Sequence, residues 1–206
     1  MAKQKQKDLT KEEFVGFFDA DGSISINLQV SKAKNSGFKM SVNLHFEIAQ
    51  AQSNIDVLKQ INKLVGGGGK IKTREPRKNT NEQPSARLSI NVNSSSGEEV
   101  LNILKLDPPR LKRVARDLQI LTSIKEIRGI NRILTTEQKA MILLLSYQNS
   151  SQIKPRSTVL KKKSIFKLKA KLGLTNQDFK DGWEAIKTHY LPKINNAEAI
   201  KKLNNK

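Results

Sequence analysis

The residues best suited to chemistry in this sequence are two carboxylates, Asp19 and Asp21, which end a short hydrophobic segment and are followed directly by Gly22. The chain has no cysteine and only two histidines. This excludes a thiol nucleophile, a zinc finger and an all-histidine metal site within one chain. Any metal that these acids bind must therefore be ligated by oxygen atoms.

The same Asp-x-Asp-Gly string has two simpler interpretations. It could begin a calcium-binding EF-hand loop, but Ser23, Ile24 and Ser25 do not continue the ligand pattern and the closing glutamate is missing. It could also be an ordinary turn at the end of a helix. The surroundings of the string therefore decide whether it is a functional site.

The charge balance points to a polyanionic partner. There are 38 Lys and Arg residues against 19 Asp and Glu, which gives a formal net charge of +19. A globular chain this basic favours nucleic acid or an anionic surface. The sequence shows no apolar run long enough to span a membrane and no secretory signal, so we expect an intracellular protein with no membrane partner. Lys, Asn and Ile are abundant, and because their codons are AT-rich we expect the gene to lie in an AT-rich genome, such as that of a chloroplast or mitochondrion.

Hydrophobic patterns predict the elements that position these acids. Thr10 and Glu13 form a capping box, which should begin a helix that ends at Gly22, a residue suited to a left-handed cap. A second helix, amphipathic and capped by Ser53 or Asn54, is expected at residues 53–65. Alternating apolar and polar residues predict four strands with one buried face, at residues 23–31, 39–50, 70–74 and 86–93.

A third helix should begin in the serine-rich segment after residue 93 and end at Asp107 and Pro108. The resulting order is αββαββα. Only helices are expected after Arg110, at residues 110–128, 136–148, 157–172 and 175–189. We divide the chain into a flexible basic tail (1–9), a core (10–130) and a helical C-terminal extension (131–206).

The segment from Phe14 to Gly22 resembles the LAGLIDADG motif of homing endonucleases. Gly16, Asp19, Ala20, Asp21 and Gly22 are identical to the consensus, while other hydrophobic residues differ. The resemblance covers residues 9–130 and implies an α+β LAGLIDADG fold with a DNA-binding antiparallel β-saddle. It further implies a metal-dependent DNA endonuclease that hydrolyses phosphodiester bonds.

The resemblance also suggests roles for individual residues. Asp21 would bind the divalent metal, Mg²⁺, together with the carbonyl oxygen of Ala20. Gln50, at the end of the second strand, would order water in the active site. A basic residue after the proline pair would complete the site, and Lys112 fits best, with Arg113 as the alternative.

One motif per chain implies a homodimer that recognises a long, partly palindromic site in double-stranded DNA. The dimer interface would be formed by the motif helix, through Phe14, Gly16, Phe17 and Asp19. A strand ribbon fits the major groove, where polar side chains can read base edges. The polar rows of the strands supply the expected DNA-binding residues: Ser25, Asn27, Gln29, Ser31, Ser41, Asn43, His45, Glu47, Lys70, Lys72, Arg74, Arg87, Ser89 and Asn91.

The alternative functions are an RNA-splicing maturase, for which intron RNA would be the partner, and a cleavage-inactive DNA-binding regulator. The intact Asp21 argues against an inactive enzyme, because a protein that only binds DNA has no need of clustered carboxylates that repel phosphate. It does not exclude a bifunctional protein.

Overall fold

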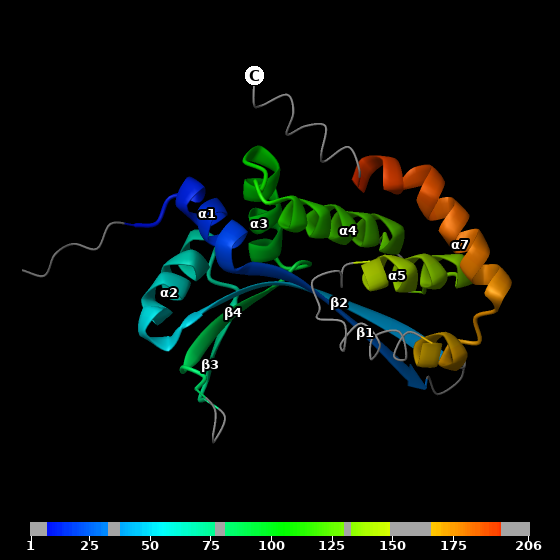
Figure 1. Cartoon of the computed structure of the whole chain (residues 1–206), viewed down its shortest axis with the longest axis horizontal. Coiled ribbons are helices and arrows are strands. Elements are labelled where there is room, and N and C mark those ends of the chain that lie inside the picture. The colour runs from blue at the N-terminus through cyan, green and yellow to red at the C-terminus, as the bar shows by residue number, and fades with distance from the viewer. Residues whose placement is uncertain (1–7, 33–37, 77–80, 130–132, 149–165, 195–206) are drawn as a thin grey trace, which may run out of the picture. The chain divides into compact units, whose positions relative to one another are not determined.

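The computed structural model describes residues 8–32, 38–76, 81–129, 133–148 and 166–194 (Figure 1). Within these ranges, no helix has both the length and the apolar character needed to cross a membrane. The order of elements confirms the αββαββα prediction and, after it, helices close to those predicted at 110–128, 136–148 and 175–189. The elements are α1 (Lys11–Asp21), β1 (Gly22–Lys32), β2 (Phe38–Ala51), a 3-10 turn (Gln52–Asn54), α2 (Ile55–Leu64), β3 (Lys70–Arg74), β4 (Ser85–Asn91), α3 (Ser95–Leu106), α4 (Lys112–Arg128), α5 (Thr136–Gln148) and α7 (Asn176–His189).

The four strands form one sheet in the order β1-β2-β4-β3. Strand β4 runs antiparallel to both neighbours, with Phe46 of β2 opposite Ile90 and Ile71 of β3 opposite Leu88. Strand β2 buries every second residue, as an amphipathic strand must. The buried row is Met40, Val42, Leu44, Phe46 and Ile48, each at most 5% exposed. The predicted sheet with one apolar and one polar face is thus confirmed.

One compact unit comprises the described residues of the ranges 1–25 and 44–114. In it, α1, α2 and α3 lie on the same side of β3 and β4 (Figure 1). Phe18 is fully buried and packs edge-on against Phe46, with ring centroids 5.8 Å apart. Leu58 and Ile61 of α2 are also fully buried. This apolar layer holds the end of α1 against the sheet.

The ends of α1 are fixed by local interactions. The capping box is confirmed: the Glu13 backbone N–H donates to Thr10 Oγ1 (3.2 Å), and the Thr10 N–H donates to Glu13 Oε2 (2.8 Å). The helix ends at Gly22 as expected, but the left-handed conformation was wrong, because Gly22 is extended with φ −76°. Glycine is required there for space, since a Cβ would lie 2.2 Å from the Phe18 carbonyl oxygen.

The start of α2 corrects a second prediction. Neither Ser53 nor Asn54 caps the helix through its side chain; the 3-10 turn Gln52–Asn54 leads into it instead. The Ser53 hydroxyl faces the Asn54 side chain at 3.5 Å. The backbone N–H of Gln52 donates to the carbonyl of Pro84 at 3.0 Å, so the chain enters α2 already anchored beside β4.

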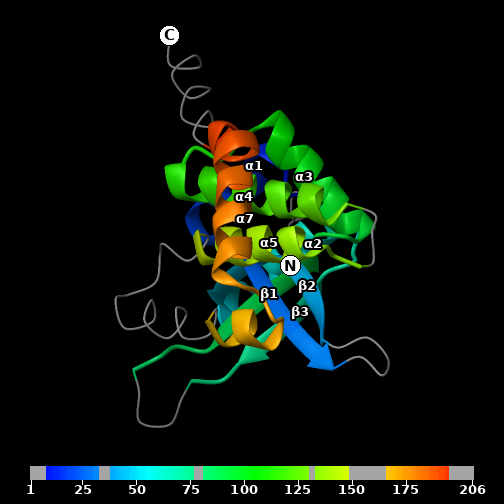
Figure 2. The same ribbon diagram turned by 90° about the vertical axis from the view of Figure 1, so that its right-hand side faces the viewer.

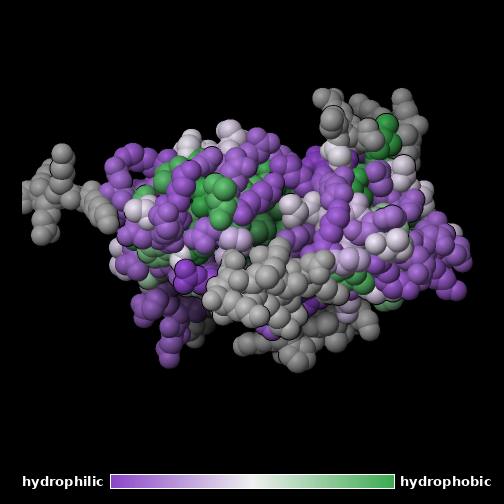
Figure 3. Space-filling view, turned by 90° about the horizontal axis from the view of Figure 1, so that it is seen from above, coloured by the Kyte–Doolittle hydropathy of each residue, from purple (hydrophilic) through white to green (hydrophobic). Residues whose placement is uncertain are grey.

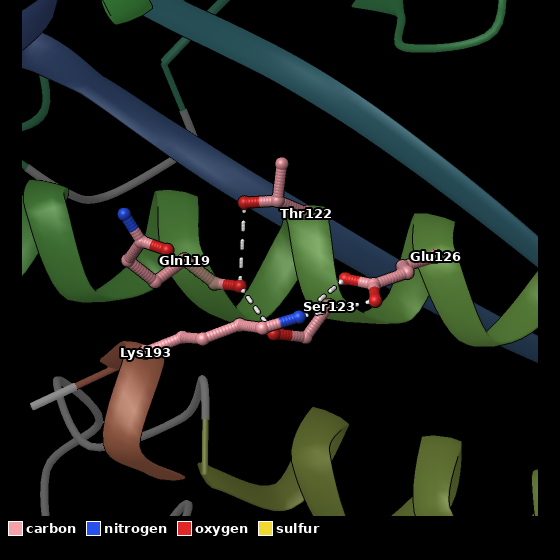
Figure 4. Close-up of polar contacts among 5 residues, drawn as sticks. All are labelled: Gln119, Thr122, Ser123, Glu126 and Lys193. Carbon is pink, nitrogen blue, oxygen red and sulfur yellow. Dashed lines mark hydrogen bonds and ion pairs between the residues drawn. The ribbon is translucent and has the colours of Figure 1, made fainter. Parts of the chain in front are cut away.

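The second compact unit comprises the described residues of the ranges 26–43 and 115–206. Helices α5 and α7 pack side by side in it (Figure 2), and Gly182 of α7 faces Ala140 of α5 so closely that a Cβ would lie 3.1 Å from the alanine Cβ. Lys193 bridges to both carboxylate oxygens of Glu126 on α4, at 3.1 and 3.2 Å (Figure 4). The expected helices at 136–148 and 175–189 are confirmed.

Two sequence predictions fall largely outside the described ranges. Of the helix expected at 157–172, only residues 166–172 are described: residues 166–171 are helical and Leu172 lies in a turn. Only residues 8 and 9 of the N-terminal tail are described.

Candidate active site

Asp21 is the last residue of α1 and is exposed. Its carboxylate Oδ2 accepts a hydrogen bond from Gln50 Nε2 at 2.5 Å. Gln50 lies near the end of β2, 29 positions further along the chain, and reaches Asp21 because the apolar contacts of Phe18 hold α1 on the sheet. The two residues that sequence reasoning selected for the same site are therefore direct neighbours.

The donor set around Asp21 fits a hard cation. Asp21 presents carboxylate oxygens at an exposed helix end, and hard divalent cations prefer such oxygen ligands. Among the described residues there is no group of three or more acidic, histidine or cysteine side chains that could hold a metal. Among the residues that the structure describes, Asp21 therefore does not belong to such a cluster.

Asp19 has a different environment. Its Oδ2 accepts from the backbone N–H of Arg110 (2.7 Å) and its Oδ1 from the N–H of Leu111 (3.2 Å). Both carboxylate oxygens are therefore engaged by the two residues that precede α4. Asp19 thus has a role within its own chain, and its assignment to a dimer interface stays a prediction. The partners lie 91 and 92 positions away, and no local sequence signal connects them with Asp19.

The clamp made by Asp19 fixes the start of α4, which carries both candidate basic residues. Lys112 is the first residue of α4 and Arg113 the second, and both are exposed. Each also has an interaction with another group. Asp19 holds the backbone immediately before Lys112, so α1 supplies Asp21 and also anchors the segment that carries the candidate cation.

The outer face of α1 is small and open. Gly16 and Ala20 are exposed, and a Cβ added to Gly16 would meet nothing within 4 Å. Phe17 is partly exposed, but Phe14 is fully buried. Its ring packs 5.9 Å from that of Phe18, so Phe14 belongs to the core of its own chain and its assignment to a dimer interface was wrong.

Two leucines that flank Pro108 and Pro109 in the sequence, next to the backbone that Asp19 holds, are also exposed. Leu106 is 83% exposed and Leu111 is 49% exposed. From the helical side, the described surface is mainly hydrophilic, with apolar residues gathered in a few patches (Figure 3).

The polar rows of β2 and β4 share the face of the sheet opposite the buried row. Two cross-strand contacts join them: His45 Nδ1 lies 3.3 Å from Ser89 Oγ, and Arg87 Nη1 lies 3.5 Å from Glu47 Oε2. The strand residues expected to bind DNA are all described and all at least partly exposed. Those fully on the surface are Asn27, Gln29, Ser31, Lys70, Lys72, Arg74, Arg87 and Asn91, whereas Ser25, Ser41, Asn43, His45, Glu47 and Ser89 are half-buried.

Residues 14–114 match the sequence model of the LAGLIDADG endonuclease family. Over these residues the chain belongs to that family. The match runs from the motif helix to the start of α4 and so includes Asp21, Gln50 and Lys112. No curated protein sequence matches the chain.

Solved structures of LAGLIDADG enzymes share the fold. The homing endonuclease I-TnaI is 21% identical, with a TM-score of 0.57 over 77% of this chain and 99% of its own. I-SmaMI, solved bound to cleaved DNA, is 17% identical, with a TM-score of 0.58 over 75% of this chain and 48% of its own. I-AabMI, solved bound to uncleaved DNA, is 16% identical, with a TM-score of 0.55 over 75% of this chain and 49% of its own. The chain thus spans I-TnaI almost completely, but only about half of the other two.

Proposed function

We propose that the chain is a site-specific DNA endonuclease that cuts both strands, with a divalent metal at the interface of a homodimer. The observation that carries this proposal is the position of Asp21. It is an exposed carboxylate at the end of α1, hydrogen-bonded to Gln50 and next to a face of α1 that is open at Gly16. Membership of an endonuclease family supports the reaction class.

The metal would be Mg²⁺ in the cell, and it would activate water and stabilise the leaving oxygen in phosphodiester hydrolysis. Asp21 would hold it, with the backbone carbonyl of Ala20 as an additional ligand. I-SmaMI has been solved with its uncleaved DNA target in the presence of calcium ions, which supports a divalent site in this fold.

Three side chains of this protein would prepare the site. Gln50 donates to one oxygen of Asp21 and thereby fixes the orientation of the carboxylate. Lys112 or Arg113, at the start of α4, would balance negative charge on the phosphate group. Asp19 keeps the backbone before them in place.

The dimer follows from the incomplete donor set. One chain supplies one carboxylate, and the helix end that carries it is already electronegative. A second copy packed on the exposed Gly16 and Ala20 face would bring the two Asp21 carboxylates together, and a cation between them would relieve their repulsion. Closely packed helices require small residues at the contact, and α1 provides them.

The DNA would lie on the polar face of the sheet. That face carries Lys70, Lys72, Arg74 and Arg87, with amide and hydroxyl side chains beside them. Arginine, lysine, asparagine and glutamine are the types that pair with guanine and adenine in the major groove. A net charge of +19 adds attraction to phosphate that does not depend on sequence. A two-fold dimer implies a long, partly palindromic target.

The proposal is tested by incubating a plasmid library of randomised sites with Mg²⁺ and the wild type, Asp21→Asn or Asp56→Asn. Asp56 is an exposed acid on α2 that pairs with Lys59 at 2.7 Å, so its variant controls for loss of one negative charge. Discrete cuts by the wild type and the control, but not by Asp21→Asn, are expected. If none of them cuts but all bind DNA or RNA, a splicing maturase with intron RNA as partner, or a DNA-binding regulator, replaces the endonuclease.

A further inference from the structure

Glu47 is unusual on the polar face of the sheet. It is the only acidic residue in the four strands, all of whose residues the structure describes. A carboxylate facing DNA is repelled by phosphate, so its presence among basic residues calls for a specific role. Its side chain is only 22% exposed, whereas its partner Arg87 is 56% exposed.

The surroundings of Arg87 explain how Glu47 acts on it. Lys72 of β3 lies directly opposite Arg87 in the antiparallel register, and like charges in such a pair repel. Glu47 approaches from the other side, on β2, with its Oε2 3.5 Å from Arg87 Nη1. The carboxylate thus offsets the repulsion and restricts where the guanidinium can point.

The pair also presents a defined hydrogen-bonding pattern at the surface. Arg87 offers donors, and Glu47 beside it offers an acceptor. In the major groove a G·C pair shows the reverse pattern: the N7 and O6 acceptors of guanine lie beside the N4 amino donor of cytosine. An A·T pair does not match, because its central group is a donor and its thymine side carries an acceptor and a methyl group.

We propose that Glu47 and Arg87 together read one G·C base pair, with Arg87 donating to guanine and Glu47 accepting from cytosine. The inference rests on the proposed function, since it requires DNA on this face of the sheet. It deepens that function by making one ion pair a determinant of specificity. In a dimer the pair occurs twice, so the G·C preference applies at two symmetric positions.

The experiment compares base preferences at every position of the target. Binding and cleavage of a library randomised around the wild-type site are sequenced for the wild type, Glu47→Gln, Arg87→Ala and Arg87→Lys. The matched control is Asp56→Asn. Asp56 pairs with Lys59 at 2.7 Å, and both lie on α2 rather than within a strand. Melting curves establish that each variant is folded.

Glu47→Gln should lower the preference for G·C at one position and its symmetric mate, because glutamine pairs with adenine instead. The loss expected from one base contact is roughly 5- to 150-fold in relative affinity. Arg87→Ala and Arg87→Lys should change the same positions, since lysine lacks the planar fork. Asp56→Asn should leave the preferences unchanged.

Two results would overturn the inference while leaving the proposed function intact. In the first, Glu47→Gln changes the affinity equally for all DNA sequences, which would show that the carboxylate acts only through its charge and reads no base. In the second, the Glu47 and Arg87 variants alter different positions, so the two residues do not read one pair. If the wild type neither binds nor cuts DNA, the proposed function fails and the inference fails with it.

Discussion

Replacing Asp19 by alanine tests whether this motif acid holds the start of α4. In the native chain its two carboxylate oxygens accept the backbone N–H groups of Arg110 and Leu111, at 2.7 and 3.2 Å. Alanine removes both acceptors at once. The segment before α4 then loses both of these hydrogen bonds to α1, and the backbone that carries Lys112 is less firmly held.

The size of the effect follows from the exposure of these groups. A hydrogen bond to a charged partner contributes about 1.5–3 kcal/mol, but Arg110 and Leu111 are exposed, so water can replace the carboxylate. Removing a side chain that caps backbone N–H groups costs about 0.5–2 kcal/mol. We therefore expect Asp19→Ala to lose about 1–2 kcal/mol of unfolding free energy. For a chain of this size that corresponds to a fall of roughly 2–8 °C in melting temperature.

The assay is thermal and urea unfolding of Asp19→Ala beside Asp21→Ala, which changes the other acid of the motif. Asp21 is exposed, accepts only the Gln50 side chain among the hydrogen bonds described for it, and lies at the negative end of α1. Its removal should therefore leave stability unchanged or slightly increased. The reasoning is refuted if Asp19→Ala melts with the wild type, or if Asp21→Ala loses as much stability as Asp19→Ala.

Three further predictions concern the dimer and the C-terminal helices. Gly16→Arg should fold normally, because a Cβ there meets nothing within 4 Å. In sedimentation we expect a dimer for the wild type and a monomer for Gly16→Arg; an unchanged dimer would place the interface elsewhere. Hydrogen bonds from the backbone N–H and the hydroxyl of Thr175 lower the pKa of Asp178. The stability that Asp178 gives α7 is therefore present above the usual aspartate pKa of about 3.9 and is lost as the pH falls below that value. Between pH 7 and 2, helicity should fall less in Asp178→Asn than in the wild type, and an equal fall would contradict the role of Asp178 as a cap. Gly182→Val should cost about 1–3 kcal/mol by overpacking against Ala140, whereas a valine at the exposed position Lys180 should cost far less in the same unfolding assay.

Most of the fold could be predicted because its signals are local. The capping box of Thr10 and Glu13 set the start of α1, and Gly22 set its end. Alternation along β2 predicted which residues are buried, since successive strand side chains point to opposite faces. The motif also identified Asp21, and its partner Gln50 followed from the family resemblance.

The rest depends on contacts between distant residues. Asp19 and Arg110 are 91 positions apart, and nothing in either segment predicts that they meet. The Glu47–Arg87 pair depends on the register of two strands, which is not readable from the alternation of either one. Phe14 was misassigned because a helix of hydrophobic residues does not reveal which side chains face its own sheet and which face outward.

The central claim is that Asp21 is the metal-binding acid of an endonuclease. Its most direct test is to measure, with Mg²⁺, both binding and single-turnover cleavage of the selected target by the wild type and Asp21→Asn. We predict that Asp21→Asn binds the target at least as tightly as the wild type, because it removes a negative charge, and that its cleavage rate falls by several orders of magnitude. Cleavage by Asp21→Asn at the wild-type rate would contradict the account.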